Sequence, residues 1–215
     1  MTLNELAFNV LNKMTGGRST HNEYISLDQI KFNINYYRSL LIHRDLRRSQ
    51  NKELFEQEIE TQIELSDRSD VDFKTISKIP QIIRLNYEYP LSVVADKRYP
   101  VQNRHAFMFS DYNRFTKDET RCYLSNNILY IKGIKDLSNG DNIRLEGIFE
   151  NPGEAYKFNG EDPLKIDDLE YPVSGDMAQR ISESLINGDF QLMLQTPNDI
   201  THDTIPPAPK GMGGN

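Results

Sequence analysis

The sequence has little of what secreted domains and metalloenzymes use. One cysteine, Cys122, in 215 residues excludes an intrachain disulfide and is typical of a reducing compartment. Tryptophan is absent, and the four histidines are scattered without HxH or HExxH spacing. No run of about 18 apolar residues occurs, so we expect no contact with a membrane. Asn4 and Glu5 interrupt the N-terminus, which therefore does not resemble a signal peptide.

The motifs of catalysis and nucleotide binding are also missing. The chain contains no CxxC, no GxGxxG, no Walker-type loop and no GxSxG elbow. Residues 136–146 superficially resemble a calcium-binding loop, but Gly140 is misplaced relative to any acid at the first ligand position. We therefore predict no catalytic residue, no cofactor and no metal ion, and a protein that is not an enzyme.

The net charge of −7 limits the possible partners. A general nucleic-acid binder needs a basic surface, so an acidic chain is not expected to hold DNA by its phosphates. An acidic surface is compatible with DNA that passes without binding. The 10 phenylalanines and 11 tyrosines can bury enough apolar area for a folded core.

Two helices are predicted near the N-terminus. Thr2 and Glu5 form a capping-box pattern, and Gly16-Gly17 ends the helix that follows. A second helix is predicted over residues 27–47. Its apolar stripe consists of Leu27, Ile30, Ile34, Tyr37 and Leu41. We interpret the pair as a helical hairpin packed on itself or on the β-core, and docking of one face on another chain is the alternative.

A small basic cluster, Arg44, Arg47 and Arg48, lies at the end of the second helix. The helix macrodipole favours cations at this end, which is enough to explain the cluster. A contact with an acidic protein surface or with phosphate is the alternative, and we treat the three arginines as candidate interface residues.

Residues 104–152 are predicted to form the centre around which the other elements are arranged. The pattern reads as strand, hairpin, strand and strand, with the hairpin turn at Ser125-Asn126-Asn127 and a turn at Asn139-Gly140. The predicted strands are 105–109, 121–124, 128–131 and 143–149. Cys122 shares a strand face with Leu124, so we expect it to be a small buried hydrophobe rather than a nucleophile.

Residues 58–65 alternate between apolar and polar side chains, which predicts a half-buried strand with an acidic outer face. We interpret its carboxylates as solvated rather than as an acid/base or metal site. Residues 66–74 are predicted to be a charged loop. Residues 76–85 are predicted to be extended, with Pro80 at an edge or strand start.

The C-terminal part is acidic and rich in turns over 151–169, followed by a predicted helix over 176–186. Beyond Asn187-Gly188 the chain alternates apolar and polar residues and then becomes rich in proline and glycine. We expect this end to be an arm that orders on a neighbouring molecule. The candidate interface residues in it are Phe190, Leu192, Leu194, Ile200 and Ile205.

These patterns predict an α+β fold with an N-terminal helical hairpin, an antiparallel β-sandwich or barrel-like domain, a C-terminal helix and an extended tail. The predicted divisions are a helical hairpin (1–54), a β domain (55–160), a returning helix with a docking segment (161–195) and a flexible C-terminal arm (196–215).

An ordered set of stretches resembles virion structural proteins of crAss-like and related short-tailed phages. They are MTLNELAFNVLNKMTGGRSTHNEYISLDQIKFNINYYRSLLIHRDL, KIPQIIRL, RFTKDETRCYLSNNILYIKG, LEGIFENPGEA and YPVSGDMAQRISESLINGDFQLMLQTPNDITHDT. Together they span most of the chain. The broad layout is also similar to that of head-to-tail adaptor proteins of the tail tubular A type.

The resemblance implies a ring or collar protein of the connector between portal and tail, which assembles as a cyclic, commonly twelve-fold ring in the virion after synthesis in the bacterial cytoplasm. Its implied partners are further copies of itself, the portal protein, and neighbouring ring and tail proteins. Packaged DNA would pass along the axis without specific binding. The resemblance supplies no catalytic residues. The alternative function is a virion-associated β-domain that binds carbohydrate or a receptor, or a tail accessory enzyme with a cleft near Tyr112, Phe115 and Tyr123.

Overall fold

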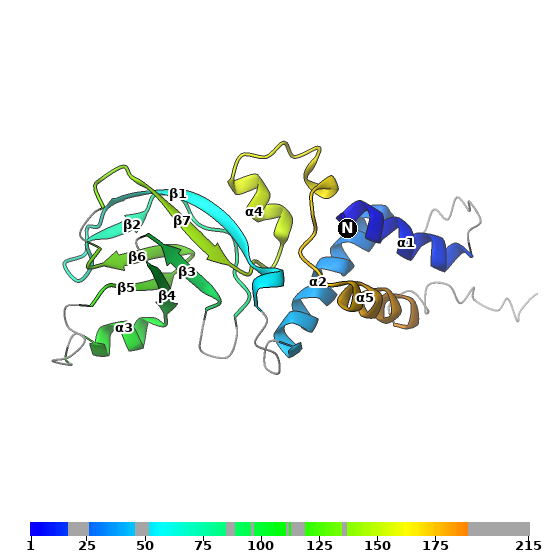
Figure 1. Cartoon of the computed structure of the whole chain (residues 1–215), viewed down its shortest axis with the longest axis horizontal. Helices are drawn as coiled ribbons and strands as arrows, with labels where there is room; N and C mark the ends of the chain where they lie inside the picture. The colour runs from blue at the N-terminus through cyan, green and yellow to red at the C-terminus, as the bar shows by residue number, and fades with distance from the viewer. Residues whose placement is uncertain are drawn as a thin grey trace, which may run out of the picture.

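A β-barrel and a helical bundle lie side by side along the long axis of the molecule (Figure 1). The structure is a computed structural model that describes residues 1–16, 26–45, 52–84, 89–95, 97–110, 112, 119–134 and 137–188. The barrel is at the left in Figure 1, α1, α2 and α5 are at the right, and α4 lies between them. The predicted α+β class is confirmed.

The described residues form five α-helices, two short 3-10 helices and seven strands. The helical elements are α1 (Leu3–Thr15), α2 (Leu27–Asp45), η1 (Glu53–Phe55), α3 (Arg104–Ser110), α4 (Pro152–Phe158), η2 (Ile166–Asp168) and α5 (Gly175–Asn187). The strands are β1 (Gln57–Leu65), β2 (Phe73–Thr75), β3 (Leu91–Val94), β4 (Arg98–Gln102), β5 (Arg121–Ser125), β6 (Ile128–Lys132) and β7 (Asn142–Gly147).

The first helix begins and ends as its sequence predicts. The Thr2 hydroxyl accepts from the Glu5 amide at 3.0 Å, and the Glu5 carboxylate accepts from the Thr2 amide at 2.8 Å. This reciprocal pair satisfies two amides that the first turn leaves without helical partners. Gly16 ends α1 in the left-handed conformation, with φ +61°.

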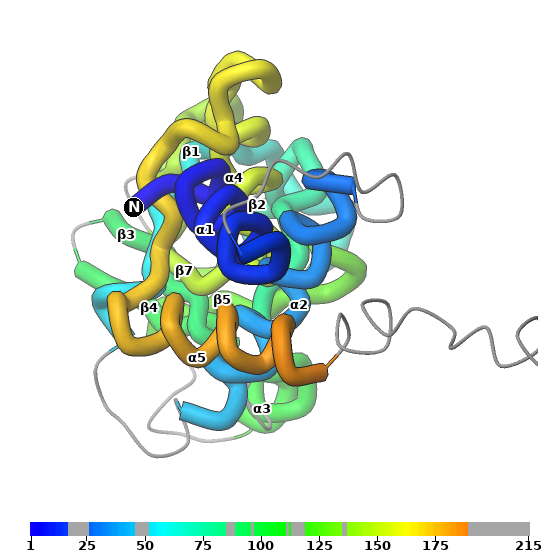
Figure 2. The backbone as a smooth tube through the Cα atoms, turned by 90° about the vertical axis from the view of Figure 1, so that its right-hand side faces the viewer, coloured from blue at the N-terminus to red at the C-terminus, as the bar shows by residue number. Residues whose placement is uncertain are grey.

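The helical core is a three-helix bundle formed by both ends of the described chain, with α5 packed against α1 and α2 (Figure 2). Its apolar centre includes Leu6, Val10, Ile34, Ile181 and Leu185. The N-terminus is also held by backbone pairing, because the Tyr171 amide donates to the Met1 carbonyl at 2.9 Å. The predicted helix over 176–186 is therefore confirmed as α5, and the residues after Gly188 lie outside the described part.

The β domain is a closed barrel with the strand order β1-β2-β6-β5-β4-β3-β7. All neighbouring strands are antiparallel except β4 and β5, which pair in parallel through Val101–Cys122 and Gln102–Tyr123. The predicted antiparallel arrangement is thus correct for six of the seven pairings.

The parallel pair explains why the predicted strand over 105–109 is wrong. Parallel strands need a crossover connection, usually a helix, and this segment forms α3 between β4 and β5. Asn103 caps the helix, since its side-chain oxygen accepts from the Ala106 amide at 2.8 Å. Phe107 of α3 then packs against the outer face of β5, where the centre of its ring lies 4.6 Å from the ring centre of Tyr123.

Two strand predictions are confirmed in detail. The β5–β6 hairpin turns through Asn126 and Asn127, whose positive φ values of 53° and 61° are those that a two-residue hairpin turn requires. In β1, Ile59, Thr61 and Ile63 face the barrel interior, as the alternation predicts. Leu65, at the end of β1, is exposed instead.

The region 151–169, predicted to be acidic turns, contains a helix that protects β1. Asn151 caps α4 by accepting from the Gly153 amide at 3.0 Å. At its other end the Asn159 side chain donates to the Glu58 carbonyl at 2.8 Å and accepts from the Glu60 amide at 3.1 Å. The side chain thereby occupies the edge of β1 that β2 does not reach, and exposed strand edges are usually covered in this way. The predicted loop 66–74 contains β2 in its last residues.

Candidate functional site

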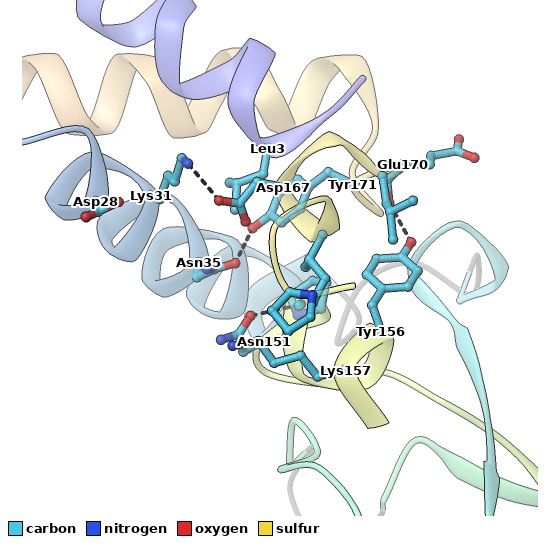
Figure 3. A pocket seen from close by; sticks show the side chains of 15 residues that line it. Leu3, Asp28, Lys31, Asn35, Asn151, Tyr156, Lys157, Asp167, Glu170 and Tyr171 are labelled. Carbon is cyan, nitrogen blue, oxygen red and sulfur yellow. Dashed lines mark hydrogen bonds and ion pairs between the residues drawn. The ribbon is translucent and has the colours of Figure 1, made fainter. Parts of the chain in front are cut away.

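A hollow of about 260 Å³ lies where the helical bundle meets α4 and the segment that leads to α5 (Figure 3). Figure 3 shows Lys31 and Asp167 pointing toward each other, and their ion pair measures 2.7 Å. The Tyr171 hydroxyl donates to the Asn35 side-chain oxygen at 2.7 Å. The Tyr156 hydroxyl donates to the carbonyl of Glu170 at 2.6 Å. These groups bind one another across the hollow, which therefore acts as a joint between elements.

The titration of the two tyrosines agrees with this structural role. Burial raises the pKa of Tyr171 and Tyr156 above the ordinary value of a phenol. Both hydroxyls therefore stay neutral donors at physiological pH. Neither is prepared as a general base, which would need a pKa near the operating pH.

Arg38 is the buried centre of the connection between bundle and barrel. Its side chain has no exposed surface, and burial lowers its pKa to about 10, so it stays a cation at neutral pH. Nη1 donates to the carbonyl of Phe149 at 2.9 Å, just after β7, and Nε donates to that of Pro172 at 3.1 Å, just before α5. The guanidinium lies 5.7 Å from the ring centre of Tyr171. Arg38 thus joins three segments that are far apart in the sequence.

A second arginine holds α5 against α2. Arg180 donates through Nη1 and Nη2 to the two carboxylate oxygens of Asp45, at 2.7 and 3.2 Å. Asp176 is a more distant partner of the same cation, at 3.5 Å. The hydrogen bonds from Arg180 hold the pKa of Asp45 below its ordinary value of 3.8.

We expect the variant Asp45→Asn to lower the free energy of unfolding by about 1–2 kcal/mol at pH 7, because it removes a bidentate pair with a cation. A carboxylate whose pKa is lower in the folded state stabilises the fold above its unfolded value. This contribution disappears as the pH falls below 3.8. Urea unfolding at pH 7 and at pH 3 should therefore show a difference between wild type and variant that shrinks at the lower pH.

Asp176→Asn is the matched control, since this carboxylate belongs to the same arginine but its side chain is 80% exposed. Its expected effect is below about 0.5 kcal/mol. Equal losses in the two variants would contradict the assignment of Asp45 as the structural partner.

Two of the three carboxylates of β1, those of Glu58 and Glu64, are paired with cations from neighbouring strands. Glu58 lies 3.6 Å from Arg144 of β7, and Glu64 lies 3.2 Å from Lys74 of β2. Arg98 of β4 binds Glu146 and also lies 3.6 Å from Glu56. An acidic face neutralised in this way does not present the clustered free carboxylates that a metal or acid/base site needs.

Of the three aromatic residues named for a carbohydrate-binding cleft, the two that the structure describes differ in exposure, and the buried one is not available to a ligand. Tyr123 has no exposed surface and stacks on Tyr130, with ring centres 4.9 Å apart. Tyr112 is 88% exposed, and Phe115 lies outside the described residues. Cys122 is fully buried in the barrel, as expected, and burial raises the pKa of its thiol to about 12.

Only one of the predicted interface residues can be placed. Arg44 is exposed at the end of α2, with an exposed side-chain fraction of 58%. Seven candidates lie outside the described residues: Arg47, Arg48, Phe190, Leu192, Leu194, Ile200 and Ile205.

The structure also shows two exposed apolar surfaces that were not predicted from the sequence. The first, which we call the α2 stripe, consists of Phe32, Tyr36 and Leu40, at exposed fractions of 70%, 54% and 47%. Residues four apart lie on one side of a helix, so the three side chains form a line opposite the buried face of α2. The i, i+4 spacing was visible in the sequence, but the inner stripe already explained the apolar content of this helix.

The second surface, the α3 patch, consists of Met108 and Phe109 of α3 and of Tyr112 just after it. The helix α3 lies beneath the barrel in Figure 1. Phe109 is 71% exposed. The sequence could not reveal this patch, because the segment was predicted to be a strand.

Within the described ranges, no cluster of three or more His, Cys, Asp or Glu side chains is arranged to hold a metal ion. None of the helices in those ranges is both long and apolar enough to cross a bilayer.

A stable fold whose polar groups are largely paired, and which leaves apolar helix faces exposed, is characteristic of a subunit that associates with other proteins. The chain belongs to the crAss ring family described as "Phage tail ring protein 2", whose model matches residues 5–205. No curated protein matches the chain. Membership of this family identifies a structural protein of the phage virion that associates with copies of itself and with other tail proteins.

Proposed function

We propose that this protein is the subunit of a closed ring in the head-to-tail connector, where it joins the portal to the tail. The observation that carries the proposal is the match to a tail ring family over nearly the whole chain, residues 5–205. The ring would be built from copies related by one rotation, with twelve copies as the expected number for connector rings of this layout. Its other partners would be the portal protein and the neighbouring ring and tail proteins.

In this proposal the ring encloses a channel for DNA that does not bind the DNA. The net charge of −7 supports this part of the proposal, because an acidic subunit repels phosphates on average. On the strands of the barrel, cations such as Arg144 and Lys74 already have carboxylate partners. Basic side chains with such partners are less able to attract the DNA backbone.

We also propose that the end of α2 and the C-terminal segment contact adjoining proteins of the tail. Arg44 supports the first part, because it is exposed at the end of its helix. The alternation of Phe190, Leu192 and Leu194 supports the second part, because apolar side chains on every second residue give an extended segment one apolar side.

The proposal is tested by quantitative mass spectrometry of purified particles, with this chain counted against the portal protein. A ratio near one is expected for a ring that matches the symmetry of the portal. The major capsid protein, which is far more abundant in the same sample, calibrates the recovery. Absence of the chain, or a trace amount, would refute a place in the connector.

A further inference from the structure

The α2 stripe is unusual because α2 is apolar on two opposite sides. Ile30, Ile34 and Ile42 on the inner side are fully buried in the bundle. The outer side of a surface helix is normally polar, yet here it carries Phe32, Tyr36 and Leu40 in a line about 12 Å long. Because the inner side already supplies the core, the outer line contributes little to the folding of the single chain.

The α3 patch is held rigidly in place although its own side chains are exposed. Phe107 is buried against Tyr123, and the Arg121 Nη1 donates to the carbonyl of Phe107 at 3.0 Å. Met108, Phe109 and Tyr112 therefore project from a helix that is fixed to the barrel. A rigid apolar projection loses little conformational entropy when it is buried by a partner.

The other large apolar residues exposed in the described part are Met1, Phe8, Leu54, Leu65, Ile76 and Leu164. Met1 and Phe8 line one open hollow at the start of α1 together with mostly polar residues. Isolated exposed apolar side chains are normal on protein surfaces. The two helical surfaces thus stand apart, one in the bundle and one under the barrel, in different halves of the molecule (Figure 1).

We propose that the α3 patch of one copy packs on the α2 stripe of the next copy and forms the repeated contact of the ring. A ring made from one chain needs a heterologous interface, in which each copy uses two different surfaces. If each copy used the same surface to bind the other, the contact would be complete in a dimer and no further copy could be added. The α2 stripe and the α3 patch satisfy this requirement, because they are two different apolar surfaces, one on the bundle and one on the barrel domain.

Their composition also fits the centre of a protein–protein interface. Four of the six side chains are Phe or Tyr, which are enriched where the binding energy is concentrated. A stable interface buries about 800 Å² on each partner, so these residues form its centre and more polar surface surrounds them. This assignment rests on the proposed ring and adds which surfaces meet.

The first experiment mixes two full-length variants, Phe32→Ser/Tyr36→Ser with a defective α2 stripe and Phe109→Ser/Tyr112→Ser with a defective α3 patch. Each variant alone should lose the ring and any contact between copies, with association weakened at least about 100-fold. Their mixture should form a dimer with one copy of each and no larger species, because only one intact stripe and one intact patch remain to meet. Native mass spectrometry gives the composition directly.

The control variant is Leu54→Ser/Leu164→Ser, which changes two exposed leucines outside both surfaces and should leave assembly unchanged. Rings in either test variant would overturn the assignment of the surfaces while the ring function stands. A dimer of the patch variant alone would show that stripe meets stripe, and a dimer of the stripe variant alone would show that patch meets patch. Either result also overturns the proposal.

A second measurement decides the case in which the purified wild-type chain is monomeric. Asn33→Cys and His105→Cys chains carry the new cysteine beside the stripe and beside the patch and keep all six apolar side chains. Mixed and treated with a short bis-maleimide, they should give covalent heterodimers in at least tenfold excess over either variant alone. Cys122 gives little background, because it is buried and its pKa is raised to about 12. No excess of heterodimer would overturn the proposed contact. The ratio to portal in particles tests the ring function separately.

Discussion

Replacing Arg38 by alanine is expected to lower the free energy of unfolding by about 3–4 kcal/mol, because it empties a fully buried site and removes the donor from the buried carbonyl of Phe149 and from the partly buried carbonyl of Pro172. In the wild-type protein, burying a cation without a carboxylate partner costs free energy. The variant removes this cost, which offsets part of the loss. Urea unfolding followed by circular dichroism measures it.

Arg44→Ala is the matched control, since it removes an exposed arginine from the same helix. We expect a change within about 0.5 kcal/mol. Arg38→Met separates the two contributions, because it keeps most of the packing but provides no donor. If Arg38→Ala and Arg44→Ala were equally stable, the role of Arg38 in joining bundle and barrel would be wrong.

Replacing Gly147 by alanine is expected to cost about 2–3 kcal/mol, because no space exists for a methyl group between β7 and β3. A Cβ at this position would lie 2.7 Å from Cδ1 of Leu91 and 2.9 Å from the carbonyl oxygen of Pro90. The leucine side chain can move, but the backbone oxygen is held, since it accepts from the Ile148 amide at 3.0 Å. The strand must therefore shift within a closed barrel. Thermal and urea unfolding would both detect the loss.

Gly175→Ala is the control for the same chemical change. No heavy atom lies within 4 Å of the added carbon, and the residue is in the first turn of α5. We expect stability to be unchanged or higher by about 0.5 kcal/mol, since alanine restricts the unfolded chain. A Gly147→Ala variant as stable as Gly175→Ala would mean that the barrel tolerates the wider spacing.

The local sequence was sufficient where neighbouring residues decide the conformation. The capping box of Thr2 and Glu5 and the hairpin turn at Asn126-Asn127 act over three or four residues. The alternation in β1 also predicted which side of that strand is buried. The exposed α2 stripe could have been predicted on the same basis, because its spacing of four residues is visible in the sequence.

Other features depend on contacts between distant segments and could not be read locally. Alternation in β5 predicted one buried face, but Cys122 and Tyr123 are both buried because α3 covers the outer side. Nothing in the residues around Arg38 indicates that it is buried, yet two carbonyls more than a hundred residues away accept hydrogen bonds from its guanidinium and make its burial tolerable. The α3 patch follows from the parallel crossover, which the residues of α3 alone do not specify.

The sequence by itself determined that the chain folds as α+β and where α1, α5, β1 and the β5–β6 hairpin lie. Through an ordered resemblance along its length it also determined that the chain belongs with virion structural proteins. Capping, turn formation and hydrophobic periodicity act over a few residues, so a linear reading is enough for them. The tertiary structure alone decided that the sheet closes into a barrel with one parallel pair, that Arg38 is buried, and that apolar surfaces remain in both halves of the molecule. Burial depends on which distant segments cover a side chain, and only the folded chain specifies that.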